Sequence, residues 1–522
     1  MPALAALPAV GLCLFFVWPL ATLVSRVVRP SSVTDALRSP GLGGVLWFTL
    51  WQAVASTVLT LVAGFAPAYL LARYRFAGRR ALVALVTVPF MLPTVVVGAA
   101  FLALLPQSWH GTGRAVLLAH VFFNIAVVVR LVGALWAVLP ADLTAAARTL
   151  GASRAQVLRH VVLPLLRPAL WAAATVVFLF TFTAFGTVRL LGGAANPTLE
   201  VEIARRATQL GDVDGAAVLS LLQLVALGGV VWWSARWQRR AALPFSSPVG
   251  ARRARSRAER RFVVFAAAGT AAMMATPLVV MVSRSFRLGG EWSLRGWRTL
   301  GNAEVRPGLS LGVDPIASLA TSLRFAAVAA TIAVVVGGLA AFAITSAHRH
   351  GRWLDVGLML PLGTSAVTIG LGLLITFDAA PFDWRAEWWL IPIGHALVAT
   401  PFVVRALLPV LRSIPANQRA AAAVLGASPL RAWWAIDVRR LRGPLLGSAG
   451  LAAAISLGEF GATTFLTRSG RDTMPIAIAR LLARTGEVPR AQGFALATML
   501  LVATALVIGL AERRGVLDAG RA

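Results

Sequence analysis

The sequence of 522 residues contains no lysine, so all 49 of its basic residues are arginines. Without lysine the chain cannot form the phosphate-binding loop G-x-x-x-x-G-K-[ST], and it cannot form a Schiff base with a carbonyl substrate. The absence of lysine therefore excludes a standard ATP-hydrolysing P-loop from this chain. It also excludes chemistry that uses a lysine amine as the nucleophile.

Cysteine and charged residues are scarce as well. The single Cys13 excludes an intrachain disulfide and a multi-cysteine metal site. No spacing of His, Asp, Glu and Cys resembles a zinc or di-iron site, so we expect no metal ligands. Charged residues make up 13% of the chain, hydrophobic residues 58%, and the mean hydropathy is +0.77. A soluble protein of this length needs a more polar surface, so the composition predicts a polytopic membrane protein.

Long apolar segments recur along the whole chain. A helix needs about 20 apolar residues to cross a bilayer, and on this criterion the sequence predicts an all-α protein with about 12 transmembrane helices, six in each half. They lie near residues 3–28, 45–72, 81–105, 114–138, 168–192, 215–235, 262–283, 317–345, 353–377, 388–411, 444–466 and 491–511. We expect the first to be a retained span, because a signal peptide begins with a basic region and only Met1 and Pro2 precede this one.

The two halves repeat each other. Several residues of the first half recur in the second, 275 positions later. The pairs are Phe185-Gly186 and Phe460-Gly461, His120 and His395, Arg130 and Arg405, and Ile203-Ala204-Arg205 and Ile478-Ala479-Arg480. An even number of spans per half orients both repeats the same way in the membrane. The sequence therefore predicts two parallel repeats related by a pseudo-twofold axis along the membrane normal.

An arginine-rich stretch separates the repeats and indicates the topology. Residues 236–261 contain nine arginines against the single Glu259, which predicts a linker between a first repeat at 1–235 and a second at 262–522. Arginine is enriched in cytoplasmic loops of membrane proteins, so we expect the linker and both termini to be cytoplasmic. The formal charge of +29 then reports topology, and we expect the lipid bilayer rather than nucleic acid as a partner.

One segment is too polar to span the membrane and occurs in both halves, at residues 141–165 and 416–440. The first copy contains Ala145, Ala146, Ala147, Gly151, Ala152 and Pro164, and the second contains Ala420, Ala421, Ala422, Gly426 and Ala427. The pattern predicts an alanine-rich helix, a break at the glycine and a second short amphipathic helix. A surface helix between the fourth and fifth spans is suited to dock into a soluble partner. The spacing by itself is equally consistent with an ordinary connecting loop.

This polar segment resembles the EAA loop of ATP-binding-cassette importer permeases, whose pattern is E-A-A-x-x-x-G-A followed by a proline. Six spans per half also match, and the resemblance covers nearly the whole chain. Two such permeases fused in one chain resemble the ferric-iron and thiamine permease group. The stretches 182–187, 191–193 and 456–461 are similar to that group too.

The resemblance implies a function. In the family the loop forms a coupling helix that lies in a groove of a cytoplasmic ATPase. The chain is then expected to be the permease subunit of an importer in the inner membrane, with two copies of the ATPase subunit as partners. An extracytoplasmic binding protein would deliver thiamine or ferric iron. The partner subunits would bind ATP, so we expect neither a cofactor nor a catalytic residue in this chain.

Two departures from the family pattern concern the coupling loops. The motif's glutamate is replaced by Ala145 in one copy and by Ala420 in the other, so the ion pair that it usually makes with the ATPase is absent. Pro164 closes the first copy, whereas Arg439 stands at the aligned position of the second. We therefore expect the two halves to couple unequally to their ATPases.

Five residues are candidates for the translocation path: Phe185, Gly186, Glu459, Phe460 and Gly461. A carboxylate at membrane depth is costly and marks a functional site by default, so Glu459 is suited to meet a cationic substrate or to gate the path. The alternatives are that an arginine pairs with it or that it lies at a water-exposed helix end. The two glycines allow close backbone approach, which is also what helix packing requires.

Other polar residues have structural interpretations. For the histidine and arginine pairs of the repeat we expect structural pairing near the membrane edge. Acidic residues between the fifth and sixth spans could attract a cation or dock a binding protein, although solvated loop acids are the commoner explanation. These are Glu200, Glu202, Asp212 and Asp214.

Two other classes of function fit a twelve-span chain. An ion-gradient-driven carrier with duplicated halves would need no ATPase, and its coupling acids should lie in the middle of spans, where this sequence has few. A membrane-embedded prenyl or glycosyl transferase needs clustered aspartates or a catalytic loop, and the sequence shows neither.

Overall fold

The computed structural model describes residues 2–27, 30–238, 251–301, 304–306, 309–310, 314–346, 348–378, 382–468 and 470–519. Helices dominate those residues. The strands form two short antiparallel pairs: β1 (Arg287–Leu288) with β2 (Glu291–Trp292), and β3 (Glu304–Arg306) with β4 (Leu309–Ser310). The structure confirms the predicted all-α class.

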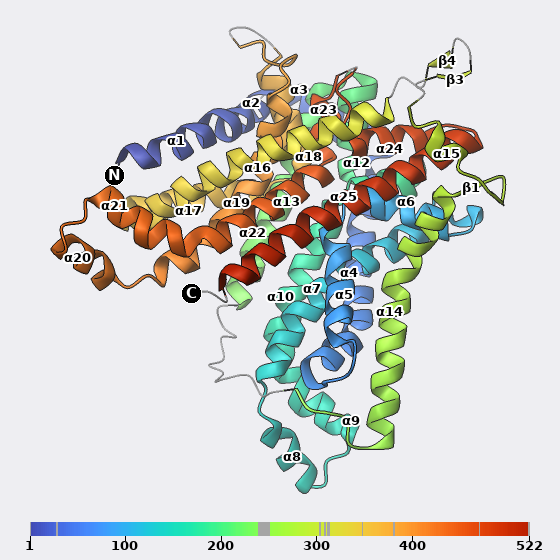
Figure 1. Cartoon of the computed structure of the whole chain (residues 1–522). Coiled ribbons are helices and arrows are strands. Elements are labelled where there is room, and N and C mark those ends of the chain that lie inside the picture. Colours follow the sequence, from blue (N-terminus) through green and yellow to red (C-terminus); the bar gives the residue numbers. More distant parts are fainter. Residues whose placement is uncertain are drawn as a thin grey trace.

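The helices form two bundles that meet at one end and diverge toward the other (Figure 1). The helices of the first half are α1 (Pro2–Leu12), η1 (Cys13–Val17), α2 (Trp18–Val27), α3 (Pro30–Arg38), α4 (Leu42–Arg73), α5 (Arg79–Met91), α6 (Thr94–Leu104), η2 (Gln107–Trp109), α7 (Gly113–Val138), α8 (Ala141–Thr149), α9 (Arg154–Val157), η3 (Leu158–Val162), α10 (Leu163–Phe182), α11 (Gly186–Leu191), α12 (Leu199–Arg205), η4 (Arg206–Leu210) and α13 (Val213–Gln238).

The second half repeats this order. Its helices are α14 (Arg257–Ser285), α15 (Arg295–Arg298), α16 (Pro315–Ser346), α17 (His348–Met359), η5 (Leu360–Gly363), α18 (Ala366–Thr376), α19 (Leu390–Arg412), α20 (Ala416–Val424), α21 (Pro429–Ala432), η6 (Trp433–Val438), α22 (Arg439–Gly458), α23 (Gly461–Leu466), α24 (Met474–Ala483) and α25 (Glu487–Ala519). Five pairs begin 275 residues apart, as the sequence offset predicts: α8 and α20, α9 and α21, η3 and η6, α11 and α23, and α12 and α24.

Most of the long helices are apolar enough to cross a membrane. Among the described residues nine helices meet the length and hydropathy of a span, and the number rises to 11 if each of two bent helix pairs is one span. The missing twelfth corresponds to α22, which opens with arginines at positions 439, 440 and 442. The structure confirms a polytopic membrane protein, whereas the exact count of twelve stays a prediction.

Two predicted spans are broken rather than straight. The span predicted at 81–105 bends by 107° between α5 and α6, and the one at 353–377 bends by 101° before α18. In the first, the break falls at Pro93, which has no N–H to continue a helix. In the second, the Ser365 side chain accepts hydrogen bonds from the backbone N–H of Val367 (3.1 Å) and Thr368 (3.4 Å), which starts a new helix.

Two other predicted spans were placed too far along the chain. The predictions at 168–192 and 444–466 are wrong in position because α10 ends at Phe182 and α22 ends at Gly458. The short helices α11 and α23 follow as separate elements. The fifth span instead begins earlier, since α9, η3 and α10 form one continuous helix from Arg154 to Phe182. The second short helix expected in the loop at 141–165 is therefore the first turn of this span.

The first helices of the two halves are exchanged between the bundles. The α1–α2 segment packs on α16 and α18 of the second half, whereas α14 packs on α5 and α6 of the first. A side-chain carbon added at Gly372 of α18 would lie 3.2 Å from Pro19 Cβ of α2, so these helices touch closely. Each bundle thus contains a helix from the other half, which ties the halves together without a covalent bond.

The predicted linker is partly helical. Within 236–261, α13 extends to Gln238 and α14 begins at Arg257, and residues 239–250 lie outside the described part of the chain. The end of the linker is fastened to the loop after α4. Arg75 N–H donates to the carbonyl of Arg252 (2.8 Å), and Arg252 N–H donates to that of Arg73 (2.9 Å).

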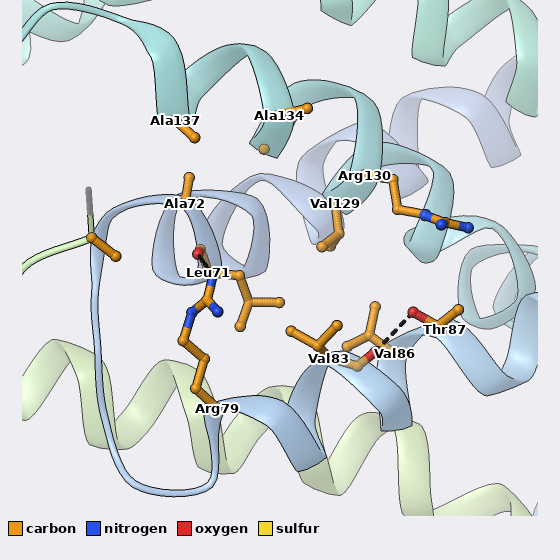
Figure 2. A pocket seen from close by; sticks show the side chains of 12 residues that line it. Leu71, Ala72, Arg79, Val83, Val86, Thr87, Val129, Arg130, Ala134 and Ala137 are labelled. Atoms are coloured by element: carbon orange, nitrogen blue, oxygen red, sulfur yellow. Dashed lines mark hydrogen bonds between the residues drawn. The ribbon is translucent and has the colours of Figure 1, made fainter. Parts of the chain in front are cut away.

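Helices pack closely where a glycine stands at their contact. Elsewhere a cavity lies between neighbouring helices. A side-chain carbon at Gly370 of α18 would lie 2.5 Å from Ala462 Cα of α23, so only a hydrogen fits there. By contrast, a cavity of about 470 Å³ lies between α4, α5 and α7 in the first bundle (Figure 2).

A substitution at Gly370 tests this packing. Gly370→Ala should destabilise the protein by about 1–3 kcal/mol, because the added methyl group forces α18 and α23 apart. Gly338→Ala is the matched control: it lies inside α16 with no atom within 4 Å of an added carbon. That control should keep or raise stability, since alanine is the better helix former by about 1 kcal/mol. Thermal unfolding in detergent measures both, and equal midpoints would contradict the packing.

Candidate gate and coupling helices

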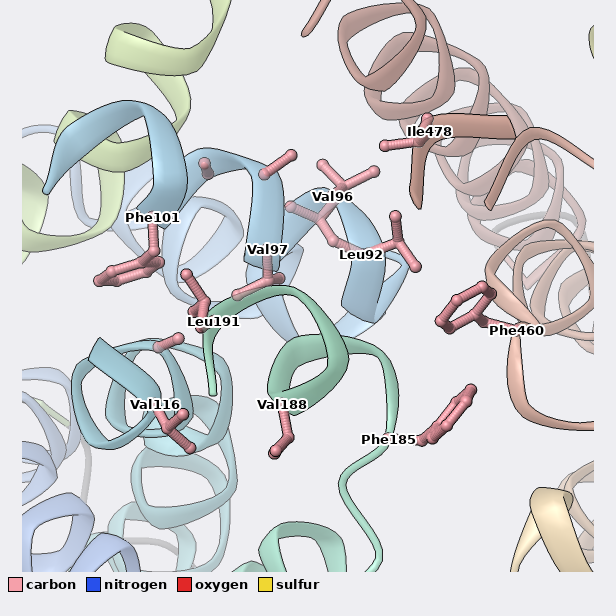
Figure 3. Packing of buried hydrophobic residues seen from close by; sticks show 14 of the residues in the cluster. Leu92, Val96, Val97, Phe101, Val116, Phe185, Val188, Leu191, Phe460 and Ile478 are labelled. Atoms are coloured by element: carbon pink, nitrogen blue, oxygen red, sulfur yellow. The ribbon is translucent and has the colours of Figure 1, made fainter. Parts of the chain in front are cut away.

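The two halves meet at a pair of phenylalanines. The rings of Phe185 and Phe460 lie 5.0 Å apart between centroids and are inclined by 30°, and both side chains are buried. Each residue stands directly before a short helix, α11 or α23, and Figure 3 shows the two rings facing each other from the two halves. These equivalent positions of the repeat therefore meet in space.

The glycines that follow allow this close approach. A side-chain carbon at Gly186 would lie 3.2 Å from a ring carbon of Phe460, and one at Gly461 would lie 3.2 Å from the backbone nitrogen of Val367. Gly458, at the end of α22, stands equally close to Pro93 at the break before α6. The structure thus brings four predicted path residues together at the contact between the halves, and we call the contact of Phe185, Gly186, Phe460 and Gly461 the seam.

Glu459 lies beside the seam and caps the start of α23. Its carboxylate accepts hydrogen bonds from the backbone N–H of Ala462 (2.9 Å) and of Thr463 (3.0 Å), and from the Thr463 hydroxyl (2.8 Å). An anion is favoured at a helix N-terminus because the first backbone N–H groups have no partner within the helix. Glu459 is 6% exposed, so this helix end is buried rather than open to water.

A histidine completes the surroundings of this carboxylate. His395 Nε2 lies 3.4 Å from Glu459 Oε2 and 2.8 Å from the Thr463 hydroxyl, while Nδ1 lies 2.7 Å from the Ser456 hydroxyl. All four side chains are buried. The sequence suggested an arginine partner or a water-exposed helix end, and the structure shows neither. The oxygens of Glu459 are thus engaged by groups of the second half, which fix the start of α23 beside the seam.

The first half lacks this arrangement. Ala184 occupies the position equivalent to Glu459. The equivalent histidine, His120, is buried inside the bundle, where Nδ1 lies 3.2 Å from the Ser56 hydroxyl and Nε2 has no partner among the described residues. Both histidines are thus buried inside their bundles, and their position near the membrane edge stays a prediction. Sequence alone could not show that only one repeat carries a carboxylate beside its histidine in space.

Acids between α10 and α13 form an internal network rather than a solvated surface. Glu202 accepts from Arg205 Nε (2.8 Å) and Arg206 Nε (3.0 Å), and Arg206 also donates to Asp212 (3.3 Å). Burial alone would raise the pKa of Glu202, but the two arginine hydrogen bonds outweigh it and hold that pKa below its usual value. Glu200 is fully buried and accepts from Gln223. The expectation of solvated loop acids is wrong for Glu200 and Glu202.

The helices α8 and α20 project from the far ends of the two bundles (Figure 1). Both are nine residues long, and each ends at a glycine in the left-handed region, Gly151 (φ 85°) or Gly426 (φ 77°). The next residue closes the turn, since Ala152 N–H donates to the carbonyl of Ala147 (3.0 Å) and Ala427 N–H to that of Ala422 (2.9 Å). This is a Schellman motif, and it explains the glycine of each copy.

The tips of these helices expose apolar side chains. Leu150 is 88% exposed, and Val424 and Leu425 are 88% and 87% exposed. Ala145 and Ala420, which replace the family's glutamate, are exposed on the same helices. Pro164 lies in the first turn of α10. An apolar tip that faces outward at the end of each bundle is a surface that a partner could cover.

The part of the chain that the structure describes holds no group of three or more His, Cys, Asp or Glu side chains placed to bind a metal ion.

Substitution of Glu459 tests the Glu459–His395 cluster. Glu459→Ala leaves two backbone N–H groups and His395 without their acceptor, and removing one partner of a buried pair costs about 3–5 kcal/mol. Glu459→Gln keeps an acceptor oxygen and should fall between that variant and the wild type. Glu291→Ala, at an exposed position of β2, is the control. Unfolding in detergent measures all three, and an unchanged midpoint for Glu459→Ala would contradict the cap.

Known proteins resemble this chain along its length. Residues 60–242 match the family model "Binding-protein-dependent transport system inner membrane component". The "Probable ABC transporter permease protein y4fN" of Sinorhizobium fredii is 26% identical over 92% of this chain and 89% of that protein. The "Thiamine transport system permease protein ThiP" of Salmonella typhimurium is 26% identical over 91% of this chain and 90% of its own length.

A third relative matches one part of the chain more strongly. The "Putative 2-aminoethylphosphonate transport system permease protein PhnV" of Salmonella paratyphi A is 30% identical over 38% of this chain and 73% of its own length. Together with the helical membrane fold, these matches confirm the predicted family and show a transporter component rather than an enzyme. The chain belongs to the binding-protein-dependent transport system inner membrane components, the permeases of ATP-binding-cassette importers.

Proposed function

We propose that this chain forms the translocation path for thiamine, which an extracytoplasmic binding protein delivers and two copies of a cytoplasmic ATPase drive across the membrane. The observation that carries the proposal is the match to a thiamine transport permease, which covers most of both chains. Because the match includes both repeats, one chain would supply both halves of the path. Ferric iron is the second candidate substrate, because two permeases fused in one chain resemble the ferric-iron and thiamine permease group.

The coupling helices support the role of the ATPases. Each bundle presents one nine-residue helix, α8 or α20, at its far end, which suits one ATPase subunit per helix. Since Ala145 and Ala420 replace the motif's glutamates, the exposed Leu150 and Leu425 would supply the contact by burying apolar surface. ATP would be bound by those partner subunits and not by this chain.

The geometry of the bundles suggests how ATP closure would move the path. The bundles meet at the seam and diverge toward α8 and α20 (Figure 1). Closing two ATPase subunits would draw α8 and α20 together, and rigid bundles would then part at the seam. The path would open first on one side of the membrane and then on the other. The buried Glu459 cluster would hold the start of α23, and with it Phe460, in the position seen here.

The remaining assignments follow from the arginine distribution and the repeat. We assign residues 1–235 and 262–522 to the two permease repeats, joined by the cytoplasmic linker at 236–261. The loops at 141–165 and 416–440 and both termini would face the cytoplasm of the inner membrane. An ion-gradient-driven carrier, the alternative with the same number of spans, would need no ATPase, and membership of this family disfavours it.

Charged substitutions at the helix tips test the coupling. Leu150→Asp combined with Leu425→Asp should lower ATP-driven uptake by more than tenfold and should abolish co-purification of the ATPase. Folding should be unaffected, because both side chains lie in solvent. Leu210→Asp, at an exposed leucine of η4, is the control. It should keep both ATP-driven uptake and co-purification of the ATPase. Normal uptake in the double variant would exclude these helices as the coupling elements.

Uptake measurements test the substrate. Cells whose thiamine import depends on this transporter should accumulate radiolabelled thiamine, and deletion of the chain should abolish that accumulation while ferric iron uptake persists. A partner binding protein that retains ferric iron but no thiamine would replace thiamine by iron as the substrate. That result would change the proposed substrate but would not change the proposed role of this chain as a permease.

A further inference from the structure

An arginine on α7 of the first bundle has no partner among the described residues. Arg130 lies on α7 within a predicted span, eight residues before the helix ends at Val138. At 1.5 Å per residue this places it about 12 Å from that end. The side chain is exposed, and it makes neither a hydrogen bond nor an ion pair with any residue that the structure describes. Arginines within membrane spans face the bundle interior or a water-filled cavity, and they pair with other ionisable groups or with backbone carbonyls.

At the equivalent position of the other repeat an acidic side chain lies nearby. Arg405, the equivalent residue of α19, lies 3.8 Å from the carboxylate of Asp355 on α17, and its Nε lies 3.1 Å from the sulfur of Met359. At the position corresponding to Asp355, 272 residues earlier, the first repeat has Val83. The second repeat therefore has a carboxylate near this arginine, whereas the first has an apolar side chain at the corresponding position.

Arg130 lines the cavity of about 470 Å³ between α4, α5 and α7. A second arginine, Arg79, lines it too, and Figure 2 shows the two guanidinium groups near different ends of the cavity. Arg79 donates one N–H to the carbonyl of Leu71 (2.7 Å), while its buried Nε has no partner within the described residues. None of the twelve residues that line the cavity is acidic.

The wall between the two arginines is apolar. Val83, Val86 and Val129 line it, and the Thr87 hydroxyl donates to its own helix through the carbonyl of Val83 (2.8 Å), so its proton is already used. The cavity thus offers guanidinium N–H donors at its ends and aliphatic surface between them. Guanidinium groups match the oxygens of a phosphate or phosphonate particularly well.

We propose that this cavity binds a phosphate-bearing ligand with an apolar body, and that Arg130 is its main cationic contact. The ligand would supply the anion that Asp355 supplies in the other repeat. The same chemistry has two sources, an anionic phospholipid and a soluble phosphomonoester. The proposal does not depend on thiamine as the substrate, because binding is measured without transport.

The experiment uses the full-length protein in two arms. The first arm measures binding of phenyl phosphate to the protein in a neutral detergent by calorimetry. The second uses nanodiscs of phosphatidylcholine with or without phosphatidylglycerol, and native mass spectrometry counts the retained anionic lipid. Each arm compares wild type with Arg130→Gln, with Arg130→Lys, and with Arg405→Gln as the matched control from the other repeat.

We expect Arg130→Gln to weaken binding at least tenfold in one arm, Arg130→Lys to weaken it less, and Arg405→Gln to bind like the wild type. Loss confined to the phenyl phosphate arm identifies a soluble ligand, and loss confined to the lipid arm identifies a phospholipid headgroup. Either result supports the site. Absence of binding to the wild type in both arms, or equal losses in Arg130→Gln and Arg405→Gln, would overturn it. Thermal midpoints within a few degrees of the wild type confirm that the variants are folded.

Discussion

The contact between the starts of α11 and α23 is the constraint on which the arrangement of the two bundles depends. Phe185 and Phe460 meet there because Gly186 carries no side chain and because Pro93 breaks its helix where α22 ends. In a bilayer the association of helices rests on such close packing, since lipid tails are as apolar as the helix surface. The seam therefore needs small residues at its centre.

The rest of the fold holds the seam in place. The exchange of α1–α2 and α14 between the bundles ties each half to the other near the point where they meet. Away from that point the bundles separate, and α8 and α20 lie far apart (Figure 1). The bundles are packed together at the seam and separated at α8 and α20. This arrangement suits the proposed rocking motion, in which a movement of α8 and α20 would change the packing at the seam.

The duplicated halves have diverged where polar residues are buried. The second repeat places Glu459 beside His395 and Asp355 beside Arg405, whereas the first has Ala184 and Val83 at the corresponding positions. Burying an ionised group without a partner is costly, and the hydrogen bonds that the buried Glu459 accepts offset this cost in the second repeat. The symmetric architecture thus carries an asymmetric set of charges.

Hydropathy and repeat spacing determined the membrane class, most of the spans and the positions of the two polar loops, because these depend on properties of continuous segments. The Schellman glycines of α8 and α20 were predictable for the same reason. The resemblance of those loops to the EAA motif indicated the family. The tertiary structure decided what depends on the approach of distant segments: the bends at Pro93 and Ser365, the exchange of first helices, and the burial of Glu200 and Glu202. It also decided that His395 is the partner of Glu459 and that Arg130 has none, since partners are selected by distance in space and not along the chain.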